Sequence, residues 1–163
     1  MRRCSVVLLA VLAGIGCLLA PPASAGETPI GRMGDTLRVE YKGFVADVTL
    51  NGLAPSPIPP GFGYPPRPPR QQVWRAQITV HTIAAPNPYG MAKAFSFRGV
   101  TPTGDAYQAR NNDSPDAMQR ILLNAPAGAT VAGGIYWDCY RDLVSNVVLL
   151  DENSGYHIAQ WNL

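Results

Sequence analysis

The stretch Val73-Trp74-Arg75-Ala76-Gln77-Ile78-Thr79-Val80-His81-Thr82-Ile83 decides the fold class. Between Trp74 and His81 apolar and polar residues alternate without a break. Successive side chains of a strand point to opposite faces, so this pattern is typical of a strand with one buried face and one wet face. It predicts that Trp74 lies in the core. It also predicts that Arg75 lies on the outer face, where its removal costs little stability.

The same alternation recurs along the chain, between clusters of Pro, Gly and Asn that favour turns. Asn51-Gly52 is one of these turns and predicts the end of a strand. Ser114-Pro115-Asp116 predicts the start of a helix of one or two turns that connects two strands. Together the segments predict a single all-β domain, a sandwich of about eight short strands at residues 37–41, 44–50, 73–83, 92–98, 105–110, 129–140, 146–150 and 156–161.

The first 25 residues have the composition of a secretory signal peptide. Met1-Arg2-Arg3 is basic, residues 6–20 carry no charge, and Ala23-Ser24-Ala25 offers small residues for cleavage. The sequence therefore predicts a secreted, extracellular protein with a signal peptide over residues 1–25 and a mature domain over residues 26–163. Lipid attachment at Cys17 is the alternative, in which the chain is anchored to a membrane surface.

The mature chain has no net charge, because the predicted leader removes two of the 13 basic residues and leaves a number equal to the 11 acidic ones. Binding to nucleic acid depends on positive charge, so this balance argues against a nucleic-acid partner. No further apolar run is long enough for a membrane span. The one remaining thiol, Cys139, shares a strand face with Ile135 and Trp137, which predicts a buried cysteine without a disulfide partner.

Residues 55–70 differ from the predicted strands in composition, because eight of these positions are proline. Proline has no backbone N–H for a sheet, so we expect an exposed, polyproline-like loop whose deletion leaves the fold intact. Pro65, Pro68 and Arg70 have the P-x-x-P-x-R spacing of polyproline ligands. The aromatic residues that we expect to be exposed in loops are Phe62, Tyr64 and Tyr89. The residues that we expect to bind a host or cell-envelope protein are Phe62, Tyr64, Arg67 and Arg70.

The sequence offers little for catalysis. No serine lies in a Gly-x-Ser-x-Gly motif, and neither histidine has a partner at metal-ligand spacing along the chain. We therefore predict a non-enzymatic protein without cofactor or metal. The alternative is a metal-binding or hydrolytic secreted enzyme whose site combines distant segments, with the candidate residues His81, His157, Asp138, Asp151 and Glu152.

Three blocks of the sequence carry a resemblance to a known family. They are Pro29-Ile30-Gly31-Arg32-Met33-Gly34, Gln72-Val73-Trp74-Arg75-Ala76-Gln77-Ile78-Thr79-Val80 and Gly134-Ile135-Tyr136-Trp137-Asp138. In this order they resemble the small secreted mycobacterial immunoprotective extracellular antigens. The resemblance implies an immunoglobulin-like antiparallel β-sandwich that is secreted and immunogenic, with no established enzymatic activity. The proline-rich segment is longer here than the family pattern, so a shared partner does not follow.

Overall fold

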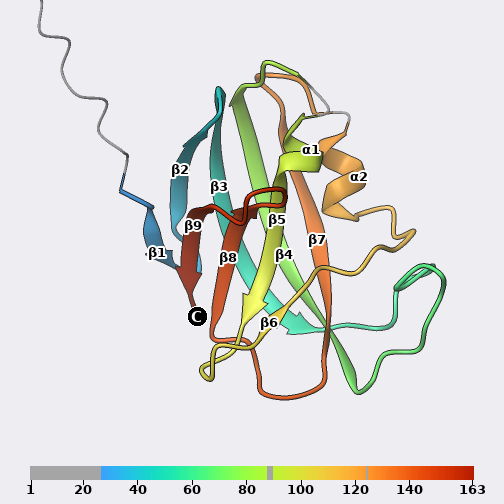
Figure 1. Cartoon of the computed structure of the whole chain (residues 1–163). Coiled ribbons are helices and arrows are strands. Elements are labelled where there is room, and N and C mark those ends of the chain that lie inside the picture. Colours follow the sequence, from blue (N-terminus) through green and yellow to red (C-terminus); the bar gives the residue numbers. More distant parts are fainter. Residues whose placement is uncertain (1–26, 88–89, 124) are drawn as a thin grey trace, which may run out of the picture.

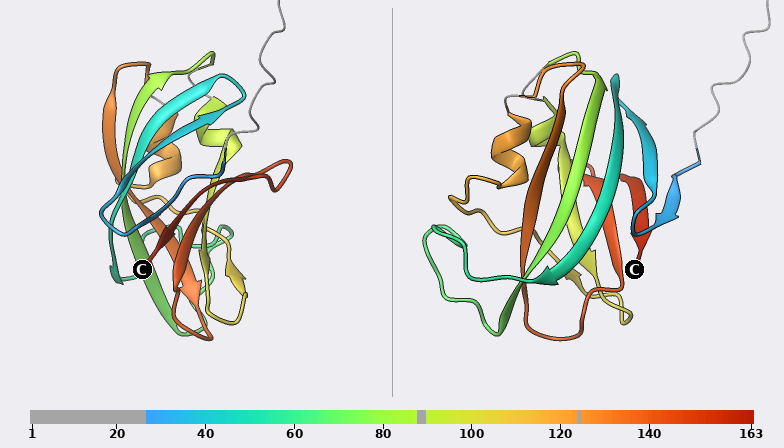
Figure 2. Two further views of the ribbon diagram at one scale, coloured as in Figure 1. Left: turned by 90° about the vertical axis from the view of Figure 1, so that its left-hand side faces the viewer. Right: turned by 180° about the vertical axis from the view of Figure 1, so that it is seen from behind.

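Two β-sheets face each other across an apolar core (Figures 1 and 2). The computed structural model describes residues 27–163 except 88–89 and 124. One sheet has the order β2-β3-β4-β7, formed by β2 (Thr36–Tyr41), β3 (Phe44–Pro55), β4 (Gln72–Ala84) and β7 (Thr130–Cys139). The other has the order β1-β9-β8-β5-β6, formed by β1 (Ile30–Arg32), β9 (His157–Asn162), β8 (Asn146–Asp151), β5 (Phe95–Val100) and β6 (Ala106–Tyr107). The predicted all-β, immunoglobulin-like sandwich is confirmed, with nine strands in the described residues. Its strand pairs are antiparallel as predicted, except that β1 and β9 run parallel.

The alternation in β4 defines the inner face of the first sheet. Ala76, Ile78 and Val80 are each at most 1% exposed. Trp74 lies on this inner face opposite Trp137, as the sequence predicts, but it is only half-buried because it sits near the start of β4. The face assignment is therefore correct, whereas Trp74 is a residue of the core's rim and not of its centre.

Two other tryptophans occupy the centre of the core, and both have no exposed surface. The indole N–H of Trp137 on β7 donates to the Phe97 carbonyl of β5, at 3.2 Å, and so joins the two sheets. The indole N–H of Trp161 on β9 donates to the carbonyl of Asp35, just before β2, at 3.1 Å. Each indole thus buries its ring and still satisfies its one polar group, which a buried tryptophan requires.

A buried carboxylate ties the ends of the two sheets together. Asp151, at the end of β8, is 1% exposed and accepts hydrogen bonds from Lys42 Nζ, Tyr41 Oη and Ser154 Oγ at 2.9, 2.6 and 2.8 Å. These donors hold the pKa of the Asp151 carboxyl well below its usual range. Since Tyr41 and Lys42 belong to the β2–β3 hairpin, an ionised Asp151 fastens that hairpin to the opposite sheet.

Three strands differ from their predicted bounds by more than one residue, and the one predicted over 105–110 covers only Ala106–Tyr107. β3 does not end at Asn51-Gly52 but continues to Pro55, because a register shift between Leu50 and Gly52 absorbs the extra residue. Nδ2 of Asn51 donates a hydrogen bond to Oγ1 of Thr79 on the neighbouring strand, at 2.8 Å. The strand predicted over 92–98 begins only at Phe95, because Gly90–Ala94 forms the short helix α1.

The connecting helix is present but begins later than predicted. α2 spans Met118–Leu122, and its N-cap residue, Ala117, makes no side-chain cap. The expected cap, Ser114, uses its hydroxyl to donate to Asp116 instead. Local cap chemistry is therefore overridden by a contact within the loop.

Some predictions fall outside the described residues. These are the signal peptide over residues 1–25, the alternative lipid attachment at Cys17 and the exposure of Tyr89. Within the part of the chain that the structure describes, no helix is long and apolar enough to cross a membrane.

Candidate functional site

The proline-rich segment forms a loop between β3 and β4, residues 56–71, which we call the proline loop. It lies at the β7 side of the molecule, away from β1 and β9 (Figures 1 and 2). Phe62 is 4% exposed and packs with Val73 and Tyr136 in a separate apolar cluster, which we call the loop seat. Val73 and Tyr136 occupy outward positions of β4 and β7, so the seat lies outside the sandwich core. The expectation that Phe62 is exposed is therefore wrong, because its ring covers the outer face of the sheet.

Backbone hydrogen bonds hold the proline loop to the segment that leads into α2. The Gly63 N–H donates to the Asn111 carbonyl and the Asp113 N–H to the Pro60 carbonyl, both at 2.7 Å. Gly61 has φ +67°, and a Cβ there would collide with the Asp113 carboxylate, so only glycine fits this close approach. The two segments thus form one surface from residues about fifty apart in the sequence, by residue number.

The conformation of the loop also differs from the predicted polyproline form. Residues 60–66 are in turns, and the Arg67 N–H closes one of them by donating to the Phe62 carbonyl at 3.0 Å. Gly63, with φ +73°, adds a second left-handed residue. An uninterrupted polyproline ligand is therefore absent over residues 60–66, because turns and the burial of Phe62 shape this part of the loop.

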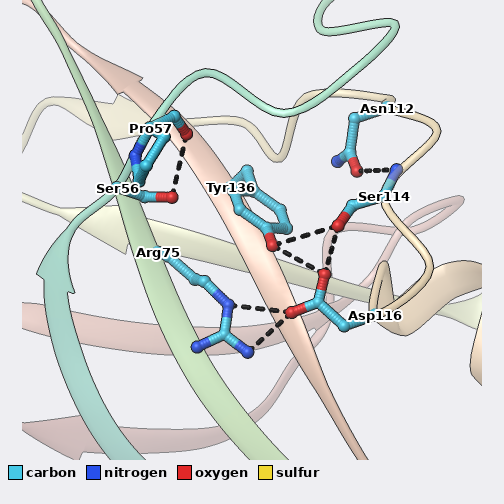
Figure 3. A network of polar contacts seen from close by, with 7 residues as sticks. All are labelled: Ser56, Pro57, Arg75, Asn112, Ser114, Asp116 and Tyr136. Carbon is cyan, nitrogen blue, oxygen red and sulfur yellow. Dashed lines mark hydrogen bonds and ion pairs between the residues drawn. The ribbon is translucent and has the colours of Figure 1, made fainter.

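A polar network holds the hydroxyl of Tyr136, one of the residues of the seat (Figure 3). Asp116 lies at its centre and accepts hydrogen bonds from Tyr136 Oη at 2.7 Å and from Arg75 Nε and Nη2 at 2.9 and 2.6 Å. The Ser114 hydroxyl donates to the same carboxylate. Tyr136 therefore has two roles: its ring packs on Phe62 and its hydroxyl is fixed by Asp116.

The electrostatics of this network favour an ionised Asp116. Burial by itself raises the pKa of its carboxyl, but hydrogen bonds from Ser114, Tyr136 and Arg75 outweigh burial and lower that pKa. Arg75 is thus an ion-pair partner and not the freely solvated side chain that the alternation predicts. Among the described residues, the side chains bonded to Ser114 are those of Asn112, Asp116 and Tyr136, so the network does not contain the serine–histidine pair of a triad.

The other half of the proline loop faces solvent. Tyr64 is 77% exposed, and Arg67 and Arg70 are exposed as well. The Arg70 N–H donates to Asp138 Oδ1 at 3.0 Å, and its guanidinium carbon lies 4.1 Å from the centre of the Tyr140 ring. Of the four predicted binding residues, the structure thus exposes Tyr64, Arg67 and Arg70 on one loop and uses Phe62 to anchor it.

The residues of the alternative enzyme are not brought together. His81 lies on β4, where Nδ1 is 2.9 Å from Thr130 Oγ1, whereas His157 lies on β9 in the other sheet. In the described residues no three His, Cys, Asp or Glu side chains are grouped so as to hold a metal ion. Asp151 is committed to Tyr41, Lys42 and Ser154, as described above.

The cysteine is buried as predicted. Cys139 is 4% exposed on the inner face of β7. Burial, with a smaller effect of the Asp138 charge, raises the pKa of its thiol to about 12. The thiolate that nucleophilic chemistry requires is therefore almost absent at neutral pH.

Among solved structures, the chain is similar to MPT63, a secreted protein from Mycobacterium tuberculosis with a crystal structure at 1.5 Å resolution. The sequences are 23% identical, and the superposition covers 85% of this chain and 100% of that chain with a TM-score of 0.63. The superposition shows a shared fold, and at the level of the fold it confirms the resemblance to the secreted mycobacterial antigens. No protein-family model matches the sequence, and no curated protein does.

Proposed function

We propose that the chain is a secreted, non-enzymatic protein that binds a host or cell-envelope protein through the proline loop, with Tyr64, Arg67 and Arg70 as contact residues. One observation carries the proposal: Phe62 is 4% exposed, whereas Tyr64, two positions later, is 77% exposed. The loop is thus anchored by one aromatic residue and presents another to solvent. A tyrosine on a fixed backbone loses little conformational entropy on binding, which favours its use at an interface.

Export and an antigenic role belong to the same proposal. Export is supported by the composition of residues 1–25 and by the description of the structural neighbour as a secreted protein. On an exported protein an anchored loop with exposed tyrosine and arginine is accessible to antibodies. We therefore include recognition by the immune system of an infected host in the proposed function.

The test is affinity capture from serum and from cell-envelope extract, with the wild-type protein and two variants. Tyr64→Ala should lose the captured partner. Ile30→Ala is the matched control, since Ile30 is also apolar and exposed, at 60%, but lies on β1 at the other side of the molecule. A partner that Tyr64→Ala retains and Ile30→Ala loses would place the recognition surface on β1 and overturn the proposal.

A further inference from the structure

Three arginines meet at two adjoining hollows beside the proline loop. The smaller hollow, of about 80 Å³, is lined by Arg67, Arg70 and Arg110 together with Asp138. The larger one, of about 200 Å³, shares Arg110 and Asp138 with it and adds Tyr140. Arg110 comes from the segment after β6, so the two sides of this surface belong to different parts of the chain.

These arginines differ from most other cations of the molecule. Arg38, Arg75, Arg120, Arg141 and Lys42 each form an ion pair with an aspartate. Among the described residues, no carboxylate forms an ion pair with Arg67, Arg70 or Arg110. Arg32 and Arg98 also lack an ion pair there, but they lie apart from the loop, on β1 and β5.

The single carboxylate of the hollow does not cancel this charge. Asp138 is 6% exposed and accepts its hydrogen bond from the backbone N–H of Arg70, not from a guanidinium. It therefore positions the chain at Arg70, and in the part of the chain that the structure describes none of the three guanidiniums forms an ion pair. Three positive charges against one negative charge make the hollow cationic, although the mature chain as a whole is neutral.

We propose that this hollow, which we call the arginine hollow, binds carboxylate side chains of an acidic peptide segment in the partner. The inference rests on the proposed function and names the chemistry of its ligand. A guanidinium binds a carboxylate through two parallel hydrogen bonds, which gives this pair both strength and direction. One water occupies roughly 10–15 Å³ of a cavity, so a hollow of about 80 Å³ admits a carboxylate group.

Two features favour a peptide over a free inorganic anion. Tyr140 lies under the guanidinium of Arg70 at 4.1 Å and holds it in a fixed orientation before a ligand arrives. The exposed Tyr64 and Ile58, which is 58% exposed, belong to the same proline loop and give it apolar surface in addition to its charge. An acidic peptide uses both the charged hollow and this apolar surface, whereas a small anion uses only the first.

The experiment measures binding of a short fluorescent peptide rich in glutamate, with the glutamine version of the same peptide as the neutral probe. The glutamate peptide should bind and lose affinity as ionic strength rises from about 0.01 to about 1 M, where the Debye length falls from about 30 to about 3 Å. Arg110→Gln should lower the affinity on the order of tenfold, as expected for the loss of a charge-assisted hydrogen bond. Arg110→Lys should recover only part of the affinity, because lysine keeps the positive charge but cannot form the two parallel hydrogen bonds of a guanidinium.

Arg32→Gln is the matched control, since it removes one unpaired charge at a distant strand and should leave the affinity unchanged. Equal binding of both peptides, no binding of the glutamate peptide, or an unchanged affinity in Arg110→Gln would overturn the inference. Displacement of the peptide by inorganic phosphate, at phosphate concentrations similar to the dissociation constant of the peptide, would also overturn the inference. The ligand would then be a small anion. The proposed function is judged separately: a partner that needs Tyr64 but binds independently of salt would uphold it and refute only the acidic chemistry.

Discussion

The core between the sheets is built from inward positions of alternating strands, whereas the loop seat is built from outward positions that a loop covers. Ile78 and Trp137 belong to the first cluster and point where the alternation predicts. Val73 and Tyr136 belong to the second and point away from the core, yet they are buried at 1% and 5% exposure. The comparison shows that the alternation of apolar and polar residues identifies one buried face of a sheet. It does not show that a loop from elsewhere in the chain buries residues on the other face.

The largest expected effect tests the inner cluster. Trp137→Ala should lower the free energy of unfolding by about 3–5 kcal/mol, because it empties a fully buried aromatic site. It also removes the hydrogen bond to the Phe97 carbonyl. Denaturant melts measure the loss. Trp74→Ala is the control and should cost clearly less, since Trp74 is half-buried; equal costs would contradict its place at the rim of the core.

The next effect tests the loop seat. Phe62→Ala should lower the free energy of unfolding by about 1–3 kcal/mol, less than in the core, since the seat contains few residues. Removal of the whole loop should cost a similar amount of stability, and the prediction from the sequence that the fold stays intact without the loop is tested by the same melt. Cys139, which lies in the inner cluster, should remain slow to react with a thiol reagent in Phe62→Ala. Rapid labelling of Cys139 in Phe62→Ala would show that loss of the loop seat also opens the core between the sheets.

A smaller effect tests the network beside the seat. Arg75→Ala should lower the free energy of unfolding by about 1 kcal/mol, because the ion pair with Asp116 is only partly shielded from water. Gln77→Ala is the control on the same outer face of β4, and its residue is exposed. Urea melts of the two variants should separate them. Identical midpoints would show that the network contributes nothing to the seat.

The same network predicts a dependence on pH. An unfolded aspartate has a pKa of about 3.9, and the pKa of Asp116 is lowered in the folded protein. The unfolded state therefore binds more protons in this range, and the stabilisation, complete above about pH 4, is lost as the pH falls through the folded pKa. Asp116→Asn should make stability fall less steeply below about pH 4 than in the wild type. Melts at a series of pH values decide this, and parallel curves would refute it.

The smallest effect on stability is expected for Tyr64→Ala. The side chain is 77% exposed and takes no part in the seat, so the free energy of unfolding should change by no more than about 0.5 kcal/mol. Phe62→Ala and Tyr64→Ala thus remove neighbouring aromatic residues with opposite consequences, one for stability and one for binding. A loss of stability in Tyr64→Ala similar to that in Phe62→Ala would mean that both rings hold the loop.

These contrasts also explain what the sequence predicts and what it leaves out. The strands with strict alternation, such as the one around Ile78, are placed correctly because burial on one face is a local signal. The buried Phe62 is missed because proline and glycine around it indicate a loop and say nothing about what the loop covers. Arg110 is missed because nothing near it in the sequence shows that it meets Arg67 and Arg70, about forty positions earlier. Residues that two loops bring together leave no repeating pattern in the sequence.

The pairing of β1 with β9 has a mechanical consequence. These strands run parallel, with Ile30 opposite Gln160 and Arg32 opposite Asn162. Hydrogen bonds from Gln160 N–H to the Pro29 carbonyl and from Met33 N–H to the Asn162 carbonyl flank the pair. When the described chain is pulled by its ends, force enters β1 at its start and β9 at its end, so the load runs along the strands. The hydrogen bonds between β1 and β9 are then loaded together in shear instead of breaking one after another. The short β1 therefore gives this end of the chain resistance to pulling.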